Sequence, residues 1–210
     1  MINNKCKICR RVGQKLFLKG DRCFSPKCAM VKRPYPPGPE RKKRKSRTGS
    51  EYKRALTEKQ KLKRWYGLSE HQFKKYVKNV LEKRDKIQDI ANELIKKLET
   101  RLDSVIFSFG FAKSRTQARQ LVSHGYFLVN NKAVNVPSFE VQKGDVVAIK
   151  EHKKKKGIFK DIAVQLKKKE IPLWLELNKE TLVGKLKADP TLADILPPAE
   201  IPTIFEFYSR

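Results

Sequence analysis

The sequence predicts an α+β protein that begins with a basic module containing four cysteines. Three observations support this fold class. Apolar residues recur at helical spacing between residues 51 and 109, short apolar runs typical of strands occupy residues 126–149, and the cysteines all lie within residues 6–28. Hydrophobic residues make up 39% of the 210 residues, which is enough for a buried core in a chain that is otherwise very basic.

Several helices are expected between residues 51 and 109. Residues 58–66 are rich in helix formers and stop at Gly67, and Ser69 followed by Gln72 has the pattern of a capping box. From Phe73 to Phe109 apolar residues recur three or four positions apart, so one face of these helices is expected to be core.

A second capping box, at residues 114–117, predicts a short helix that ends at residues 124–125. Its apolar residues at positions 118, 121 and 122 should face the core. On the same helix Arg115, Arg119 and Gln120 should face outward.

Three short strands are expected after that helix, over residues 126–129, 133–136 and 146–149. Asn130 and Asn131 suit a turn with positive φ between the first two. Together with the preceding helices, these strands are expected to form a helix pair packed on a small twisted sheet. Further short strands are expected towards the C-terminus, within residues 172–184.

The four cysteines form two closely spaced pairs, Cys6 with Cys9 and Cys23 with Cys28. Paired cysteines at this spacing are typical of tetrahedral zinc, and four thiolates would close its coordination shell, so we predict one structural Zn²⁺. Disulfides, redox-active thiols and an iron–sulfur cluster are the alternatives. Disulfides need an oxidising compartment, and no apolar signal stretch precedes the first cysteine.

The net charge of +27 predicts a polyanionic partner, because so basic a surface repels itself unless it is neutralised. Residues 1–50 hold 16 Lys or Arg against 2 acids. Nucleic acid is the expected partner. An anionic membrane is the competing one, but the sequence has no lipidation motif, no apolar stretch of spanning length and no basic amphipathic anchor.

A basic arm is expected after the cysteines. Residues 34–39 are rich in proline and predict an extended connector, and residues 41–47 are nearly all Lys or Arg. Such a run can be a solvated tail or a localisation sequence, but its position between two ordered segments favours an arm laid along phosphates. Tyr35, within the proline run, could stack on a base.

Residues 111–125 and 129–132 resemble the small RNA-binding fold that takes its name from small ribosomal subunit protein four. Three flanking segments narrow the resemblance to the family of that ribosomal protein itself: residues 58–67, 98–103 and 205–210. The cysteine segment and residues 35–38 resemble the bacterial, zinc-carrying branch of the family.

This resemblance implies a structural protein, not an enzyme, located in the cytoplasm within the small ribosomal subunit. It implies direct binding to small-subunit rRNA at a junction of the 5′ domain, nucleation of the subunit body, and an influence on translational accuracy together with ribosomal protein five, near the mRNA entry channel. Neither a membrane nor a second copy of the chain is expected as a partner.

Four segments are expected on this basis. They are a zinc module and basic arm at residues 1–50, a helical domain at 51–97, an inserted RNA-binding domain at 98–150 and a C-terminal segment at 151–210 that returns to the helical domain.

Recognition of folded RNA needs many distributed cations and a few polar side chains, since its base edges are mostly hidden. Arginine is favoured over lysine, because a planar guanidinium can pair with two phosphate oxygens. The candidate rRNA-binding residues are Arg10, Arg11, Lys15, Arg22, Arg41, Lys42, Lys43, Arg44, Lys45, Arg47, Lys59, Lys61, Lys63, Arg64, Lys113, Arg115, Arg119, Gln120, His124 and Lys132.

The main alternative function is an RNA-modifying enzyme or another RNA-binding regulator that uses the same small fold. An enzyme would need a catalytic constellation, and the sequence contains no Gly-rich phosphate loop or nucleophile motif.

Overall fold

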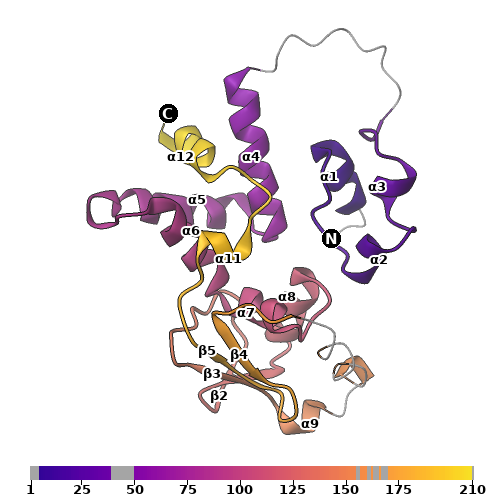
Figure 1. Cartoon of the computed structure of the whole chain (residues 1–210), viewed down its shortest axis with the longest axis vertical. Coiled ribbons are helices and arrows are strands. Elements are labelled where there is room, and N and C mark those ends of the chain that lie inside the picture. Colours follow the sequence, from indigo (N-terminus) through magenta and orange to yellow (C-terminus); the bar gives the residue numbers. More distant parts are fainter. Residues whose placement is uncertain are drawn as a thin grey trace. The chain divides into compact units, whose positions relative to one another are not determined.

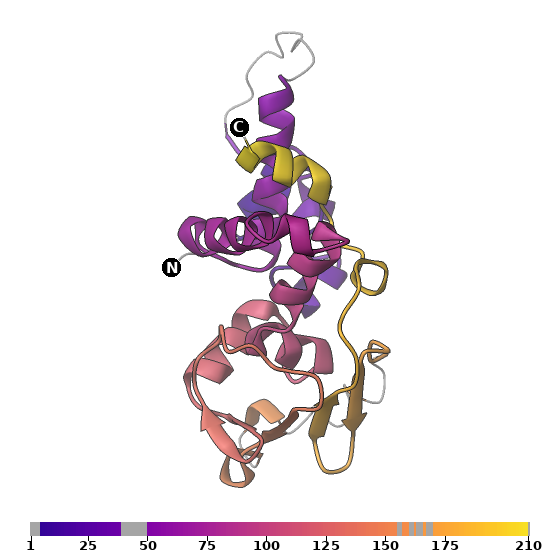
Figure 2. The same cartoon turned by 90° about the vertical axis from the view of Figure 1, so that its left-hand side faces the viewer.

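The computed structural model describes residues 5–38, 50–154, 157–159, 162, 166 and 170–209. The chain forms two compact units. Unit 1 consists of Met1–Lys86 together with Pro197–Arg210, and unit 2 of Ile87–Leu196. The chain therefore leaves unit 1, builds unit 2 and returns, as its colours show in Figures 1 and 2.

Unit 1 begins with three short helices, α1 (Lys5–Val12), α2 (Asp21–Phe24) and α3 (Ala29–Lys32). Cys6 and Cys9 lie in α1, Cys23 lies in α2, and Cys28 directly precedes α3. Helix α1 packs against α3. Cys9, Cys23 and Cys28 are buried, and so is Leu16 in the connection between α1 and α2. The sequence analysis identified the two cysteine pairs but did not predict the helices in this segment.

The rest of unit 1 consists mainly of α4 (Glu51–Trp65), α5 (Glu70–Leu81) and α12 (Ile201–Ser209), with a short 3₁₀ turn, η1 (Arg84–Lys86). The predicted start of α5 is confirmed, because Ser69 Oγ accepts from the backbone N–H of Gln72 at 3.2 Å. Ser50 Oγ caps α4 in the same way, accepting from the N–H of Lys53. Helix α12 packs against both α4 and α5.

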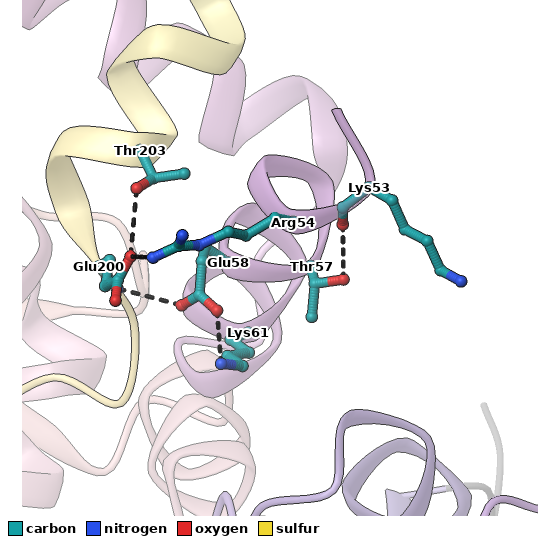
Figure 3. Close-up of polar contacts among 7 residues, drawn as sticks. All are labelled: Lys53, Arg54, Thr57, Glu58, Lys61, Glu200 and Thr203. Atoms are coloured by element: carbon teal, nitrogen blue, oxygen red, sulfur yellow. Dashed lines mark hydrogen bonds and ion pairs between the residues drawn. The ribbon is translucent and has the colours of Figure 1, made fainter. Parts of the chain in front are cut away.

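Polar contacts fasten the start of α12 to α4 (Figure 3). Glu200 Oε2 accepts from Arg54 at 3.1 Å and from Thr203 Oγ1 at 3.3 Å. The backbone N–H of Glu200 donates to Glu58 Oε2 at 3.1 Å, which satisfies one of the N–H groups that a helix start leaves open. Beyond these contacts, Ile204 is fully buried.

The helices of unit 2 are α6 (Ile90–Glu99), α7 (Leu102–Phe109) and α8 (Arg115–Ser123). The second predicted capping residue is also confirmed, because Ser114 Oγ accepts from the N–H of Gln117 at 3.3 Å. Helix α8 ends at Ser123 and is capped by His124, and the next residue, Gly125, has a φ of 64°, a conformation that glycine adopts without strain. Shorter pieces are α9 (Glu151–Lys154), η2 (Gly157–Phe159) and α11 (Leu192–Ile195).

The strands form one antiparallel sheet in the order β2-β1-β3-β5-β4. They are β1 (Phe127–Val129), β2 (Lys132–Val134), β3 (Val146–Ile149), β4 (Leu175–Asn178) and β5 (Val183–Leu186). The turn between β1 and β2 is as predicted, with Asn130 and Asn131 at φ of 48° and 64°. Residues of α7, α8 and the strands share one core, which includes Phe109, Phe127 and Trp174.

The borders of the two units differ from the segments expected from the sequence. Helix α6 belongs to unit 2, and β5 pairs with β3, so residues 151–196 complete the sheet and core begun by residues 98–150. The part of the C-terminal segment that belongs to unit 1 is Pro197–Arg210. The long-range pairing between β3 and β5 has no local sequence pattern that could have predicted it.

Candidate nucleic-acid interface

The four cysteines line one pocket in unit 1, together with Lys5, Leu18, Lys19, Ala29 and Met30. None is in a disulfide. The backbone N–H of Lys19 points at Cys23 Sγ, 3.4 Å away. Burial raises the pKa of the Cys9 thiol; a backbone hydrogen bond with Leu16 opposes this rise, and the three other cysteines add to it.

A metal site is compatible with these residues by their chemistry. Among the residues that the structure describes, no three or more His, Cys, Asp or Glu side chains meet in the arrangement of a metal centre. The donor set still suits zinc, because four unpaired thiols that share one pocket are the ligands of a closed structural site. The assignment of zinc stays a prediction.

The cysteine segment is very basic, with ten Lys or Arg and one acid, Asp21, in residues 5–38. Of the candidate residues here, Arg11, Lys15 and Arg22 are exposed. Arg10 instead donates through Nε to the carbonyl of Tyr35 at 2.9 Å, and its guanidinium lies 4.9 Å from the centre of the Tyr35 ring. The side chains of Arg11, Lys15 and Arg22 are thus accessible to a ligand, whereas the guanidinium of Arg10 lies against the Tyr35 ring.

The candidate lysines of α4 have carboxylate partners within unit 1. Lys61 Nζ pairs with Glu58 at 2.5 Å, and Lys59 and Lys63 both pair with Glu70 at 2.7 Å. Arg64 differs from them, because burial and then the nearby Arg11 guanidinium lower its pKa. Arg64 is thus partly buried near a like charge, that of Arg11.

Glu70 joins α4, α5 and α12. It accepts from Lys59, Lys63 and the Tyr208 hydroxyl, the last at 3.0 Å. Burial disfavours its ionised form, but these three hydrogen bonds outweigh it and lower the pKa of Glu70 to about 2. Burial and the charge of Glu70 raise the pKa of Tyr208. Lys59 also lies over the Phe207 ring, 4.4 Å from its centre.

In unit 2, two buried carboxylates hold the arginines of α8. Arg119 donates through Nε and Nη2 to Asp103 Oδ2, at 2.9 and 2.7 Å, and Arg101 grips the same carboxylate. Arg115 donates to Glu99 Oε1 at 2.7 Å. The carboxylate side chains are 1% exposed at Glu99 and 4% at Asp103.

The expected outward position of Arg115 is wrong, since its side chain is only 12% exposed. Arg119 is 32% exposed and lies at the edge of the cluster. Sequence reasoning did not identify Glu99 and Asp103 as the partners of these arginines, because each carboxylate lies sixteen residues before its arginine. Glu99 did offer an indication, as an acidic residue between Leu98 and Leu102 in an apolar stripe.

The remaining candidates of unit 2 are exposed. Lys113, Gln120 and His124 flank or belong to α8, and Lys132 begins β2. The carbonyl of His124 accepts from Lys153 Nζ at 2.7 Å. The candidates of the basic arm lie outside the described residues: Arg41, Lys42, Lys43, Arg44, Lys45 and Arg47.

Comparison with known proteins accounts for this combination of helices, sheet and cations. Residues 1–99 match the family model of the ribosomal protein S4/S9 N-terminal domain, and residues 100–147 match the S4 domain. An S4 domain packed from a helix pair and a small sheet places the chain in a class of RNA-binding proteins.

Full-length relatives narrow that class. Small ribosomal subunit protein uS4 of Caldicellulosiruptor saccharolyticus is 50% identical over all of this chain and 98% of its own length. The protein of the same name from Thermus thermophilus is 43% identical over 98% of this chain and 96% of its own length. The chain belongs to the small ribosomal subunit protein uS4 family. In its described parts, no helix is both long and apolar enough to cross a membrane.

Proposed function

We propose that this chain is a structural, non-enzymatic component of the small ribosomal subunit that binds the subunit's rRNA directly. The observation that carries the proposal is the full-length match to ribosomal proteins of the uS4 family. The net charge of +27 supports it, because rRNA is the polyanion that would neutralise such a surface. The same full-length match favours this function over an RNA-modifying enzyme.

Pre-positioned arginines support a specific mode of binding in unit 2. A guanidinium held by a buried carboxylate loses little side-chain entropy when it meets a phosphate. Asp103 holds Arg119 in this way at the rim of α8, next to the exposed Gln120. Arg119 is therefore the favoured contact of this helix, and Arg115 acts mainly by fastening α8 to Glu99.

One structural zinc ion is part of the proposal. Cys6, Cys9, Cys23 and Cys28 would hold it, since they line one pocket as free thiols. Zinc would supply cross-links between α1, α2 and α3, a segment too short to fold on an apolar core of its own. Its role is to present the cations of residues 5–38 in a fixed arrangement.

The family resemblance supports the finer parts of the proposal. They are binding at a junction of the 5′ domain, early nucleation of the subunit body, contact with ribosomal protein five, an influence on decoding accuracy near the mRNA entry channel, and a cytoplasmic location. The protein would act as a single copy in each subunit.

Binding of the full chain to a transcript of the small-subunit 5′ domain tests the proposal. The affinity should fall steeply with salt, by about 0.7–0.9 log units per log unit of salt for each phosphate contacted. Arg22→Gln, at an exposed candidate, should reduce that slope by about one contact. A chain that binds this transcript no better than an unrelated RNA of equal length would contradict the proposed function.

A further inference from the structure

An exposed pair of stacked aromatic rings lies in the cysteine segment. The rings of Phe17 and Phe24 are 4.9 Å apart between centroids, with 26° between their planes. Phe24 is 77% exposed and Phe17 is 42% exposed. Neighbouring exposed rings form a contiguous apolar surface, which can mark an interaction site, and a ligand that covered them would gain the free energy of burying that surface.

The backbone turns Phe17 outward at a cost. Its φ is 51°, in the left-handed region that a bulky side chain rarely adopts. Its neighbour Leu16 is 1% exposed, and Leu18 lines the pocket of the cysteines. The left-handed conformation thus sends the middle residue of an apolar run to the surface, where it meets Phe24.

The charge around the pair indicates what would cover it. Residues 5–38 carry ten cations against the single acid Asp21, so the segment suits a polyanion. Lys15 and Arg22 are exposed, each two residues before one of the rings. Aromatic rings set among cations are the arrangement that binds unpaired nucleotides, with bases on the rings and phosphates on the cations.

We propose that the Phe17–Phe24 pair is a stacking platform for one unpaired base of the RNA, with Phe24 as the outer ring. The platform depends on the proposed rRNA binding and adds a recognised element to it. A phenyl ring offers no hydrogen bond to the base edge, so the platform tolerates any base but requires that the base be unpaired. Tyr35 is less suited, because the guanidinium of Arg10 already lies against its ring.

Substitution of Phe24 in the full chain tests the platform with the 5′-domain transcript. Phe24→Ala and Phe24→Leu should weaken binding by about 5- to 150-fold, the scale of one lost base stack. Phe24→Trp, which keeps an aromatic face, should bind at least as tightly as the parent chain. Val31→Ala is the matched control, because Val31 is a half-exposed apolar residue of the same segment. The salt slope should be the same in all of these variants, since no phosphate contact is removed.

Three results would overturn the platform. The first is that Phe24→Ala binds the transcript as tightly as the parent chain. The second is that Phe24→Leu binds as tightly as the parent chain, which would indicate that an apolar contact suffices without an aromatic ring. The third is a loss that appears only when other ribosomal proteins are present, which would assign the rings to a protein partner. In each of these the parent chain still binds the transcript, whereas failure of the parent chain to bind would contradict the proposed function itself.

Discussion

Arg119 of α8 and Asp103 of α7 are joined by two hydrogen bonds that end on one carboxylate oxygen, Asp103 Oδ2. Arg101 donates to both oxygens of the same carboxylate, through Nε to Oδ1 and through Nη2 to Oδ2. A single buried carboxylate therefore accepts hydrogen bonds from two guanidinium groups and links α7 to α8. Removing that anion would take a countercharge from two guanidinium groups, of which that of Arg101 is only 3% exposed.

Asp103→Asn should lower the free energy of unfolding by about 3–5 kcal/mol, because it keeps the size of the side chain and removes the buried countercharge. Urea unfolding measures the change. Asp85→Asn is the control; its side chain is 88% exposed, and we expect a change within about 0.5 kcal/mol. Equal effects of the two substitutions would show that the buried pair contributes nothing.

Gly184→Ala should destabilise unit 2 by about 1–3 kcal/mol or more. A Cβ at this position of β5 would lie 2.3 Å from Cζ of the Phe109 ring, which is fully buried and has little room to move. Gly157→Ala is the matched control, because a Cβ there meets nothing within 4 Å. Thermal unfolding of both variants measures the difference. Similar melting temperatures would show that the backbone of Gly184 does not lie tightly against the Phe109 ring.

Ionised Glu70 should stabilise unit 1 in a pH-dependent way. Its pKa in the folded chain, about 2, lies below the ordinary value of 4.5, so the stabilisation is complete above about pH 4.5 and disappears as the pH falls towards 2. We expect only about 1 kcal/mol, because the side chain is 47% exposed and water screens its ion pairs.

Urea unfolding of Glu70→Gln against the parent chain, from neutral pH down to about pH 3, measures this contribution. The difference in stability should shrink as the pH falls. Glu82→Gln serves as the control, with its carboxylate 3.6 Å from Lys78 on the surface of unit 1. A difference that grew on acidification would reverse the sign argued here.

Chelation should remove about one zinc ion per chain and loosen the cysteine segment, because structural zinc binding and folding are coupled. Hydrogen exchange should accelerate in α1, α2 and α3 and stay unchanged in α7, which serves as the internal control. Cys23→Ser should reproduce the effect without a chelator. Protein purified under reducing conditions that contains no metal would contradict the zinc assignment.

A fragment of residues 87–196 should fold cooperatively, whereas residues 98–150 alone should not. The shorter piece lacks β4 and β5, which leaves β3 paired with β1 alone and removes Trp174 and Leu186 from the core. Circular dichroism during urea unfolding distinguishes the two. A sharp transition for the shorter fragment would show that its three strands suffice.

Local features were predictable because they depend on neighbours in the chain. Ser69 and Ser114 cap their helices as expected, and the Asn130–Asn131 turn has positive φ, since each needs only a few adjacent residues. The four cysteines line one pocket, whereas the zinc ion that their spacing indicated stays a prediction.

Pairings across long stretches of sequence were not predictable. Arg115 looked exposed from its helical position, but Glu99, sixteen residues earlier, draws it inward. Glu70 is 138 residues from Tyr208, and no periodicity relates them. The outward turn of Phe17 depends on one backbone angle, and in the sequence it reads as part of an apolar run.

Unit 1 is assembled from two stretches of chain with the whole of unit 2 between them. During synthesis α4 and α5 therefore emerge well before α12, the helix that covers them. At about 5–20 residues per second the intervening 110 residues, Ile87–Leu196, take roughly 5–20 s to make. For that interval Phe73, whose ring meets Tyr208 in the finished fold, lacks its cover. Unit 1 therefore cannot complete its fold until the last residues of the chain have been made, although its first residues are among the earliest.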